Sequence, residues 1–395
     1  MTSATRTLKA APVWQGTSFI QPLVLDKTLL WSAVALSVLG WLMVTSASMD
    51  WAQRRFDNAF YISFRHGAYL LLAGATAWVV AHLPLNFWKK LSGFIILGAL
   101  ASLVVVLIPG IGREINGSTR WLSLGIMNLQ PSEFAKLATV IYMAGYLDRR
   151  REEVQSKWSG FIKPLLILSM LAVLLLLEPD FGAVVVMMAT ALALLFLGGV
   201  KAGQFVLTMV TVLAACVAIL VSQPYRMQRL AAYMDPWSAD NVYNGGYQLT
   251  QSLIAFGRGE WFGVGLGNSI QKLFYLPEAH TDFVFAIWAE ETGILGAVVL
   301  VALFALVFIR AMKLGKRAID QQYYFAAFIA YGMAMLIGFQ AFINLGVNMG
   351  LLPTKGLTLP FVSYGGSSLL ACAIAMAMIL RVHHELSSKD KRSNP

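Results

Sequence analysis

The sequence predicts an all-α, polytopic integral membrane protein with about ten transmembrane helices and a large extracytoplasmic loop between helices 7 and 8. Composition is the first observation: 58% of the 395 residues are hydrophobic and only 13% are charged, whereas a soluble domain carries about 25% charged residues. Second, the apolar residues fall in blocks close to the roughly 20 residues that cross a bilayer. Because backbone groups in lipid must hydrogen-bond internally, each block is expected to be helical.

The predicted spans follow one another along the chain. They cover residues 28–48, 66–83, 91–109, 131–147, 164–177, 182–199, 203–221, 283–309, 323–343 and 367–380. A single membrane domain over 28–385 contains them, because no other segment is long enough to form a second core. Residues 1–27 and 386–395 are predicted cytoplasmic tails, and the first lacks the apolar core and cleavage site of a signal peptide.

The distribution of charge predicts the orientation. The net charge of +10 could suggest a nucleic-acid partner, but most Lys and Arg residues fall in the two tails and in short loops on the same side of the predicted spans. The positive-inside rule then places both termini in the cytoplasm and residues 222–282 outside. A multi-pass protein of the cell inner membrane is therefore expected, with no nucleic acid as partner.

The outer segment 222–282 is the longest polar part of the chain. Residues 223–234 have the spacing of an interfacial helix, residues 247–256 predict a second helix, and the glycine-rich run after them matches no nucleotide-binding motif. Glu278 and Asp282 close the segment directly before an apolar block. Asp282 could simply cap the next helix, or it could be a general base that takes a proton from a substrate hydroxyl.

Basic and acidic residues elsewhere are also expected on the outer side. Arg120 and Trp121 could be interfacial anchors, or a guanidinium that grips phosphate beside an apolar surface. Lys136 lies three residues after Glu133 on one helical face. A lysine inside a span is rare, so it either forms a buried ion pair with Glu133 or meets an anionic ligand.

Four further carboxylates have less specific patterns. Asp180 can cap the next helix, and together with Glu178 it could line a cavity or attract a divalent cation. Glu290 and Glu291 are expected to pair with a basic residue or to line the cavity.

Residues 344–368 contain prolines, glycines and serines, which predicts a bent or re-entrant outer segment. Lys355 within it is a further candidate phosphate contact. Taken alone, these residues predict either a transferase that uses a lipid phosphate or a transporter of one.

Five strings, in this order, resemble those of a known family. They are NGSTRW at 116–121, QPSEFAK at 130–136, EPDFG at 178–182, PEAHTD at 277–282 and SYGGSS at 363–368. The family is the SEDS proteins (shape, elongation, division and sporulation), and the resemblance spans nearly the whole chain. Residues 265–273 and 352–360 favour its proteobacterial division branch. Phe274 departs from the pattern, because some division relatives carry an acidic residue there.

The resemblance implies a peptidoglycan glycosyltransferase that acts in cell division and cell wall synthesis at the septum. It would polymerise lipid II and release undecaprenyl pyrophosphate. Asp282 would be the catalytic base and Glu278 would assist it. Substrate would be bound by Lys136, Glu133, Arg120, Trp121 and Lys355. A divalent cation (Mg²⁺ or Mn²⁺) could offset the charge of the leaving group, with ligands that the sequence does not identify, and no nucleotide is expected.

The resemblance also implies partners, namely the class B penicillin-binding transpeptidase FtsI and divisome activators such as FtsQ, FtsL, FtsB and FtsN. Two other functions fit parts of the sequence. A lipid II flippase without transferase chemistry would also use intramembrane charges. A structural division scaffold would explain the spans but leave the outer carboxylates without a role.

Overall fold

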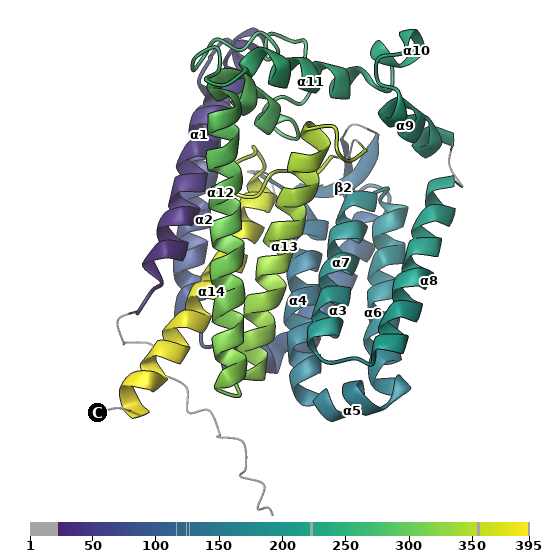
Figure 1. Cartoon of the computed structure of the whole chain (residues 1–395), viewed down its shortest axis with the longest axis vertical. Coiled ribbons are helices and arrows are strands. Elements are labelled where there is room, and N and C mark those ends of the chain that lie inside the picture. Colours follow the sequence, from purple (N-terminus) through teal and green to yellow (C-terminus); the bar gives the residue numbers. More distant parts are fainter. Residues whose placement is uncertain are drawn as a thin grey trace, which may run out of the picture.

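The computed structural model describes residues 23–115, 117–123, 125, 127–221, 224–353 and 356–393. A bundle of long helices forms its body (Figure 1). These helices are α1 (Lys27–Phe56), α2 (Tyr61–His82), α3 (Leu85–Val106), α4 (Pro131–Arg149), α6 (Trp158–Leu177), α7 (Phe181–Leu197), α8 (Ala202–Val221), α12 (Val284–Asp320), α13 (Tyr324–Asn348) and α14 (Gly366–Ser393).

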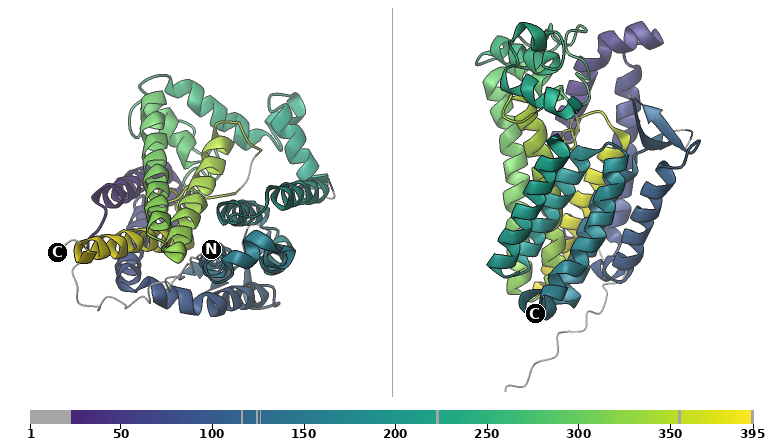
Figure 2. Two further views of the ribbon diagram at one scale, coloured as in Figure 1. Left: turned by 60° about the horizontal axis from the view of Figure 1, so that its bottom comes forward. Right: turned by 90° about the vertical axis from the view of Figure 1, so that its right-hand side faces the viewer.

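The remaining elements lie at the two ends of the bundle. Helices α9 (Pro224–Met234), α10 (Ala239–Val242) and α11 (Tyr247–Gly259) form a layer over one end. Strands β1 (Gly112–Ile115), β2 (Ser118–Ser123) and β3 (Asn128–Leu129) lie at the same end (Figure 2). We call the end that carries α9–α11 and β1–β3 the loop end. The short helix α5 (Arg151–Ser156) lies at the opposite end.

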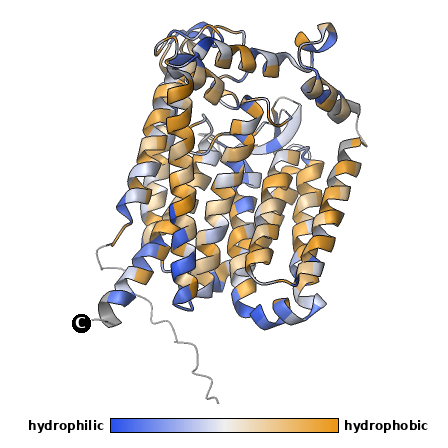
Figure 3. Cartoon of the chain, viewed as in Figure 1, coloured by the Kyte–Doolittle hydropathy of each residue, from blue (hydrophilic) through white to orange (hydrophobic). Residues whose placement is uncertain are grey.

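The predicted class, a helical membrane protein, is confirmed. In the described part of the chain, α1, α3, α6, α12, α13 and α14 are long and apolar enough to cross a membrane, and α7 and residues Ala202–Ala215 of α8 are shorter apolar helices. Figure 3 shows apolar residues along the bundle and hydrophilic residues on α5 and on the adjacent ends of α12 and α14. The count of ten spans stays a prediction.

Two helices form the centre of the bundle. Nearly every side chain of α4 from Pro131 to Leu147 is buried, and α13 packs against α4, α7, α12 and α14. The polar side chains at Lys136 on α4 and at Gln340, Asn344 and Asn348 on α13 are at most 3% exposed, so they face protein. This placement matters for Lys136 on α4 and for three amide residues on α13.

The three-stranded sheet was not predicted. It covers most of the stretch between α3 and α4, which includes the NGSTRW string at 116–121, and residue 116 lies outside the described residues. The strands pair antiparallel in the order β1-β2-β3, with Leu122 opposite both Gly112 and Leu129. The shortest strand has two residues, which is too short for the alternation of apolar and polar residues that predicts strands.

The segment that follows α11 at the loop end is joined to a break in α12. Gly293 has φ 68° and ψ −168° within that helix, so nearby peptide groups cannot pair along it. Val264 and Gly265 donate their backbone N–H groups to the carbonyls of Glu290 and Glu291, at 3.0 and 3.1 Å. Ile294 in turn donates to the carbonyl of Glu260 at 2.9 Å. The segment after α11 is therefore hydrogen-bonded to α12 through main-chain atoms.

Candidate functional site

Asp282 lies at the loop end, two residues before α12 begins. In the described chain the N-cap of α12 is Phe283, without a side-chain hydrogen bond to the first turn, so the structure does not support the alternative in which Asp282 caps the helix. Asp282 is half-buried. Its Oδ2 atom lies 3.0 Å from the position that a Cβ atom on Gly356 would occupy. The carboxylate therefore faces the segment that follows α13.

The surroundings of Asp282 favour its protonated form. Burial raises the pKa of Asp282 to about 7, and the negative charges of Glu278 and Asp180 act in the same direction. The positive charges of Arg120 and Arg229 act against it. The carboxylate therefore changes its charge near neutral pH, where a general base works best.

Glu278 occupies a strained turn beside Asp282. Its φ is 56°, and its carboxylate accepts a hydrogen bond from the Thr281 hydroxyl at 2.7 Å. His280 lies between the two acids, and its carbonyl accepts a hydrogen bond from the Tyr364 N–H at 3.0 Å. The His280 ring is 5.7 Å from the Tyr364 ring. The predicted PEAHTD and SYGGSS strings are thus in contact.

Lys136 and Glu133 form a buried ion pair on α4. The Nζ–Oε1 distance is 2.9 Å, and 2% and 6% of the two residues are exposed. Lys136 also donates to Oε1 of Gln340 at 2.6 Å. The predicted pairing is confirmed, and contact of Lys136 with an anionic ligand stays a prediction.

Arg120 uses two donors on the protein itself. Its Nε and Nη2 atoms donate to the carbonyls of Glu178 and Pro179 at 2.8 and 2.6 Å, so strand β2 is bonded to the turn between α6 and α7. Trp121 is partly buried in the same strand. A phosphate contact through the remaining nitrogen of Arg120 stays a prediction. Lys355 lies outside the described residues.

Glu178 and Asp180 have different environments. Asp180 caps α7 as predicted, accepting from the Ala183 N–H at 3.1 Å and from the Ser132 hydroxyl at 2.9 Å. Glu178 is buried, and neither of its carboxylate oxygens has a hydrogen-bond partner among the described residues. Burial and the charge of Asp180 raise the pKa of Glu178 to about 8, against the opposing charge of Arg120.

A metal site with several protein ligands is not evident in the described part of the chain, where no three His, Cys, Asp or Glu side chains come together. Magnesium, however, is often held by one or two carboxylates together with phosphates and water. The unpartnered oxygens of Glu178 beside Asp180 would fit that second kind of site. The divalent cation stays a prediction.

Glu290 and Glu291 bind the outer segment to the bundle. Glu290 accepts from Arg258 at 2.8 Å, from the Ser269 hydroxyl and from the N–H of Ile270 at 3.1 Å. Glu291 accepts from Lys272 at 3.0 Å and from the Ser46 hydroxyl of α1 at 2.7 Å. The prediction that these acids pair with basic residues is confirmed.

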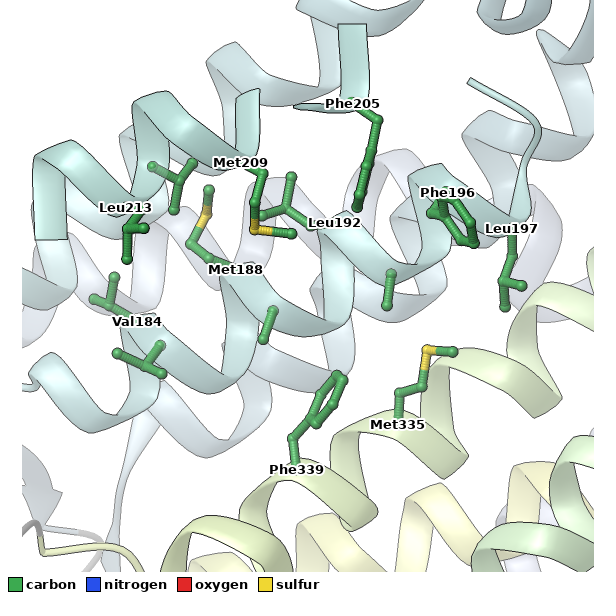
Figure 4. Close-up of a pocket in the computed structure, with 14 residues that line it drawn as sticks. Val184, Met188, Leu192, Phe196, Leu197, Phe205, Met209, Leu213, Met335 and Phe339 are labelled. Atoms are coloured by element: carbon green, nitrogen blue, oxygen red, sulfur yellow. The ribbon is translucent and has the colours of Figure 1, made fainter. Parts of the chain in front are cut away.

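An apolar pocket of about 590 Å³ opens between α7, α8 and α13 (Figure 4). Val184, Met188 and Leu192 of α7 line one side, facing Met335 and Phe339 of α13. Val184 lies one helical turn beyond Asp180, and its N–H bonds the Asp180 carbonyl at 3.3 Å. The pocket therefore starts close to the carboxylates of the loop end.

Three amide residues on α13 were not predicted as site residues from the sequence. Asn344 and Asn348 both donate to the carbonyl of Asp282, at 2.9 and 3.0 Å, and Gln340 binds Lys136. The polar residues from 344 onward were assigned to a bent segment, whereas α13 continues to Asn348. Their spacing of four residues inside an apolar helix was the signal that could have identified them.

The fold and the site define a class of protein: a polytopic helical membrane protein with acidic and basic side chains gathered at one end of the bundle. Residues 27–388 match the model of the FtsW/RodA/SpoVE family, described as cell cycle protein. The chain belongs to this family, which agrees with the resemblance found in the sequence.

Known proteins support the assignment. The chain is 53% identical over 371 residues to the probable peptidoglycan glycosyltransferase FtsW of Hahella chejuensis, covering 94% of this chain and 93% of that protein. A chain in a peptidoglycan synthase complex that coordinates polymerization and crosslinking matches with 29% identity and a TM-score of 0.75, covering 92% of this chain and 99% of that one. The rod shape determining protein RodA of Thermus thermophilus matches with 28% identity and a TM-score of 0.68, covering 92% and 98%.

Proposed function

We propose that this protein is a peptidoglycan glycosyltransferase that polymerises lipid II into glycan strands at the division septum. The observation that carries the proposal is Asp282, a half-buried carboxylate at the loop end with a pKa of about 7. Relatives named as peptidoglycan glycosyltransferases match nearly the whole chain. A scaffold protein would not need such a base.

In the proposed reaction, Asp282 takes the proton from the 4-hydroxyl of the acceptor sugar as its oxygen attacks the anomeric carbon of the donor. A new C–O bond forms, the bond from the anomeric carbon to the pyrophosphate breaks, and undecaprenyl pyrophosphate leaves. Glu278 assists by keeping the pKa of Asp282 high through its charge.

The leaving pyrophosphate gains negative charge, which nearby cations would offset. We assign this role to Lys136, Arg120 and Lys355. Glu133 orients Lys136 through their ion pair, and Trp121 packs beside the substrate. A bound Mg²⁺ or Mn²⁺ would neutralise phosphate charge, and Glu178 and Asp180 would hold it.

The lipid tail of the substrate is assigned to the apolar pocket between α7, α8 and α13. Its lining is apolar from Val184 to Phe196 on α7, which suits a prenyl chain. The prenyl tail would thus enter the pocket beside the loop end, while the sugar of the same substrate lies near Asp282.

For the whole chain we propose ten membrane-spanning helices in the inner membrane, with both termini in the cytoplasm. The membrane domain covers 28–385 with tails at 1–27 and 386–395, and residues 222–282 face the periplasm. Lys89, Arg150 and Lys163 lie at or near the cytoplasmic end in this orientation, consistent with the positive-inside rule. The class B transpeptidase FtsI and the activators FtsQ, FtsL, FtsB and FtsN are the proposed partners, and the match to a synthase complex supports a transpeptidase partner.

Polymerisation of labelled lipid II by the purified protein with its transpeptidase partner tests the function. We expect ladders of glycan on a gel, and weaker ladders when a chelator removes divalent cations. If labelled lipid II crosses liposome membranes and no ladders form, the protein is a flippase and the glycosyltransferase proposal is wrong.

The pH dependence of polymerisation tests the role of Asp282. A base acts in its deprotonated form, and the pKa of this carboxylate is raised to about 7. We therefore expect kcat to fall about tenfold for each pH unit below neutrality. An acid limb near pH 4, the ordinary range of an aspartate, would contradict this assignment. Circular dichroism across the same pH range controls for unfolding.

A further inference from the structure

Three amide side chains form a row along the buried face of α13. Gln340, Asn344 and Asn348 are spaced four residues apart and therefore lie on one side of the helix. At most 3% of each residue is exposed. Buried amides cost free energy unless their donors and acceptors are satisfied, so their partners indicate what they are for. We call these three residues the amide ladder.

Asn348 is bonded to both sides of the junction between Asp282 and α12. Its Nδ2 atom donates to the carbonyl of Asp282 at 3.0 Å. Its Oδ1 atom accepts from the Ala286 N–H at 3.1 Å. Ala286 is in the first turn of α12, whose own N-cap contributes no side-chain bond in the described chain. Asn348 thus supplies a cap for α12 from a different helix.

Asn344 is hydrogen-bonded to the carbonyl of Asp282 and to the segment that faces the Asp282 carboxylate. Its Nδ2 atom donates to the Asp282 carbonyl at 2.9 Å and to the Leu357 carbonyl at 2.5 Å. Gly356, directly before Leu357, is the residue that Asp282 Oδ2 approaches. One amide group therefore ties the main chain of Asp282 to the segment that the Asp282 carboxylate approaches.

Gln340 extends the row to the cation on α4. It accepts from Lys136 at 2.6 Å and donates to the Thr358 carbonyl at 3.1 Å. The ladder thus connects the lysine to the aspartate through a single rigid helix and residues 357–358. Lys136 and Asp282 both have a role in the proposed reaction.

We propose that Asn348 and Asn344 are positioning residues that hold Asp282 in the geometry required for proton abstraction. The proposal rests on the proposed function. Both bonds go to the main-chain carbonyl of Asp282 and neither uses a carboxylate oxygen, so the base is held without being neutralised. A misplacement of about 1 Å can cost about 10²-fold in rate, and two buried hydrogen bonds to one carbonyl restrict movement of that size.

Substitution of Asn348 tests the proposal by lipid II polymerisation kinetics of the protein with its transpeptidase partner. Asn348→Leu removes both bonds at similar size. Asn348→Asp keeps the acceptor for the Ala286 N–H and loses the donor to the Asp282 carbonyl. It is the variant to measure if Asn348→Leu does not fold. We expect kcat to fall about 10²-fold in each, with KM for lipid II changed less than about threefold. Ser252→Ala is the matched control, because Ser252 bonds the Asn348 carbonyl at 2.7 Å but neither amide nor Asp282; we expect it to keep kcat within about threefold.

Hydrogen–deuterium exchange gives a readout that does not need activity. In Asn348→Leu we expect faster exchange of the amides around residues 280–288 than in the wild type and in Ser252→Ala. Unchanged exchange there, or kcat retained in both Asn348 variants, would overturn the positioning role. A rise in KM equal to the loss in kcat would also overturn it, since that indicates a binding role. If the wild type makes no glycan at all, the proposed function fails, and the exchange result still decides whether Asn348 holds the segment.

Discussion

Asp282→Asn is expected to abolish detectable glycan polymerisation while leaving the protein folded in the membrane. The substitution keeps the size of the side chain but removes its negative charge and its ability to accept a proton. A positioned general base contributes about 10²- to 10⁴-fold to a rate, so kcat should fall by that factor. KM for lipid II should change little, because the substrate is bound by other groups. The measurement is the steady-state rate of polymerisation at several concentrations of labelled lipid II, with the transpeptidase partner present.

Asp57→Asn provides the matched control for this variant. Asp57 is an exposed aspartate at the C-terminal end of α1 with φ 53°, a conformation that asparagine tolerates well. The same chemical change there should leave kcat unaltered. Full activity of Asp282→Asn would rule out the base assignment, and equal loss in both variants would point to a general effect of the lost charge.

Lys136→Met is expected to destabilise the protein strongly and to stop polymerisation. The methionine leaves the Glu133 carboxylate buried without its cation, and loss of one partner of a buried pair costs about 3–5 kcal/mol. The Gln340 carbonyl also loses the donor that lies 2.6 Å away. Thermal unfolding in detergent, followed by tryptophan fluorescence, measures the loss of stability.

The double variant Glu133→Gln/Lys136→Met separates stability from activity. It removes both charges, so most of the lost stability should return, whereas polymerisation should not return if Lys136 offsets the charge of the leaving group. Recovery of both would mean that the lysine is only a structural partner of Glu133. Lys163→Met is the control, since the Lys163 side chain in its pair with Glu153 is 54% exposed and the pair should contribute little.

The helices of the bundle were largely predictable because a membrane span is specified by a long apolar block. The predicted fourth span, 131–147, agrees with α4 (Pro131–Arg149), where a proline defines the first turn. The helices predicted over residues 223–234 and 247–256 also agree with α9 and α11. The sheet β1–β3 could not be predicted, because β3 has only two residues and the six residues of β2, STRWLS, do not alternate between apolar and polar side chains.

The site was only partly predictable, for a different reason. Charged residues inside or beside apolar blocks stand out, which is how Lys136 and Asp282 were found. Neutral amides such as Asn344 do not stand out in this way, and their importance depends on what another helix places opposite them. Likewise, the sequence indicates that Arg120 could bind a phosphate. Only the fold shows that Arg120 donates hydrogen bonds to the carbonyls of residues 178 and 179.

The break in α12 has a consequence for engineering this protein. A Cβ atom on Gly263 would come within 2.2 Å of the Glu291 carbonyl oxygen, and one on Gly293 within 2.5 Å of the Gly263 nitrogen. The atoms that each Cβ would meet belong to the main chain. A larger side chain at either position therefore cannot be accommodated by shortening a neighbouring side chain. Libraries or inserted tags aimed at the loop end should therefore leave this pair intact and use exposed sites such as Tyr243 instead.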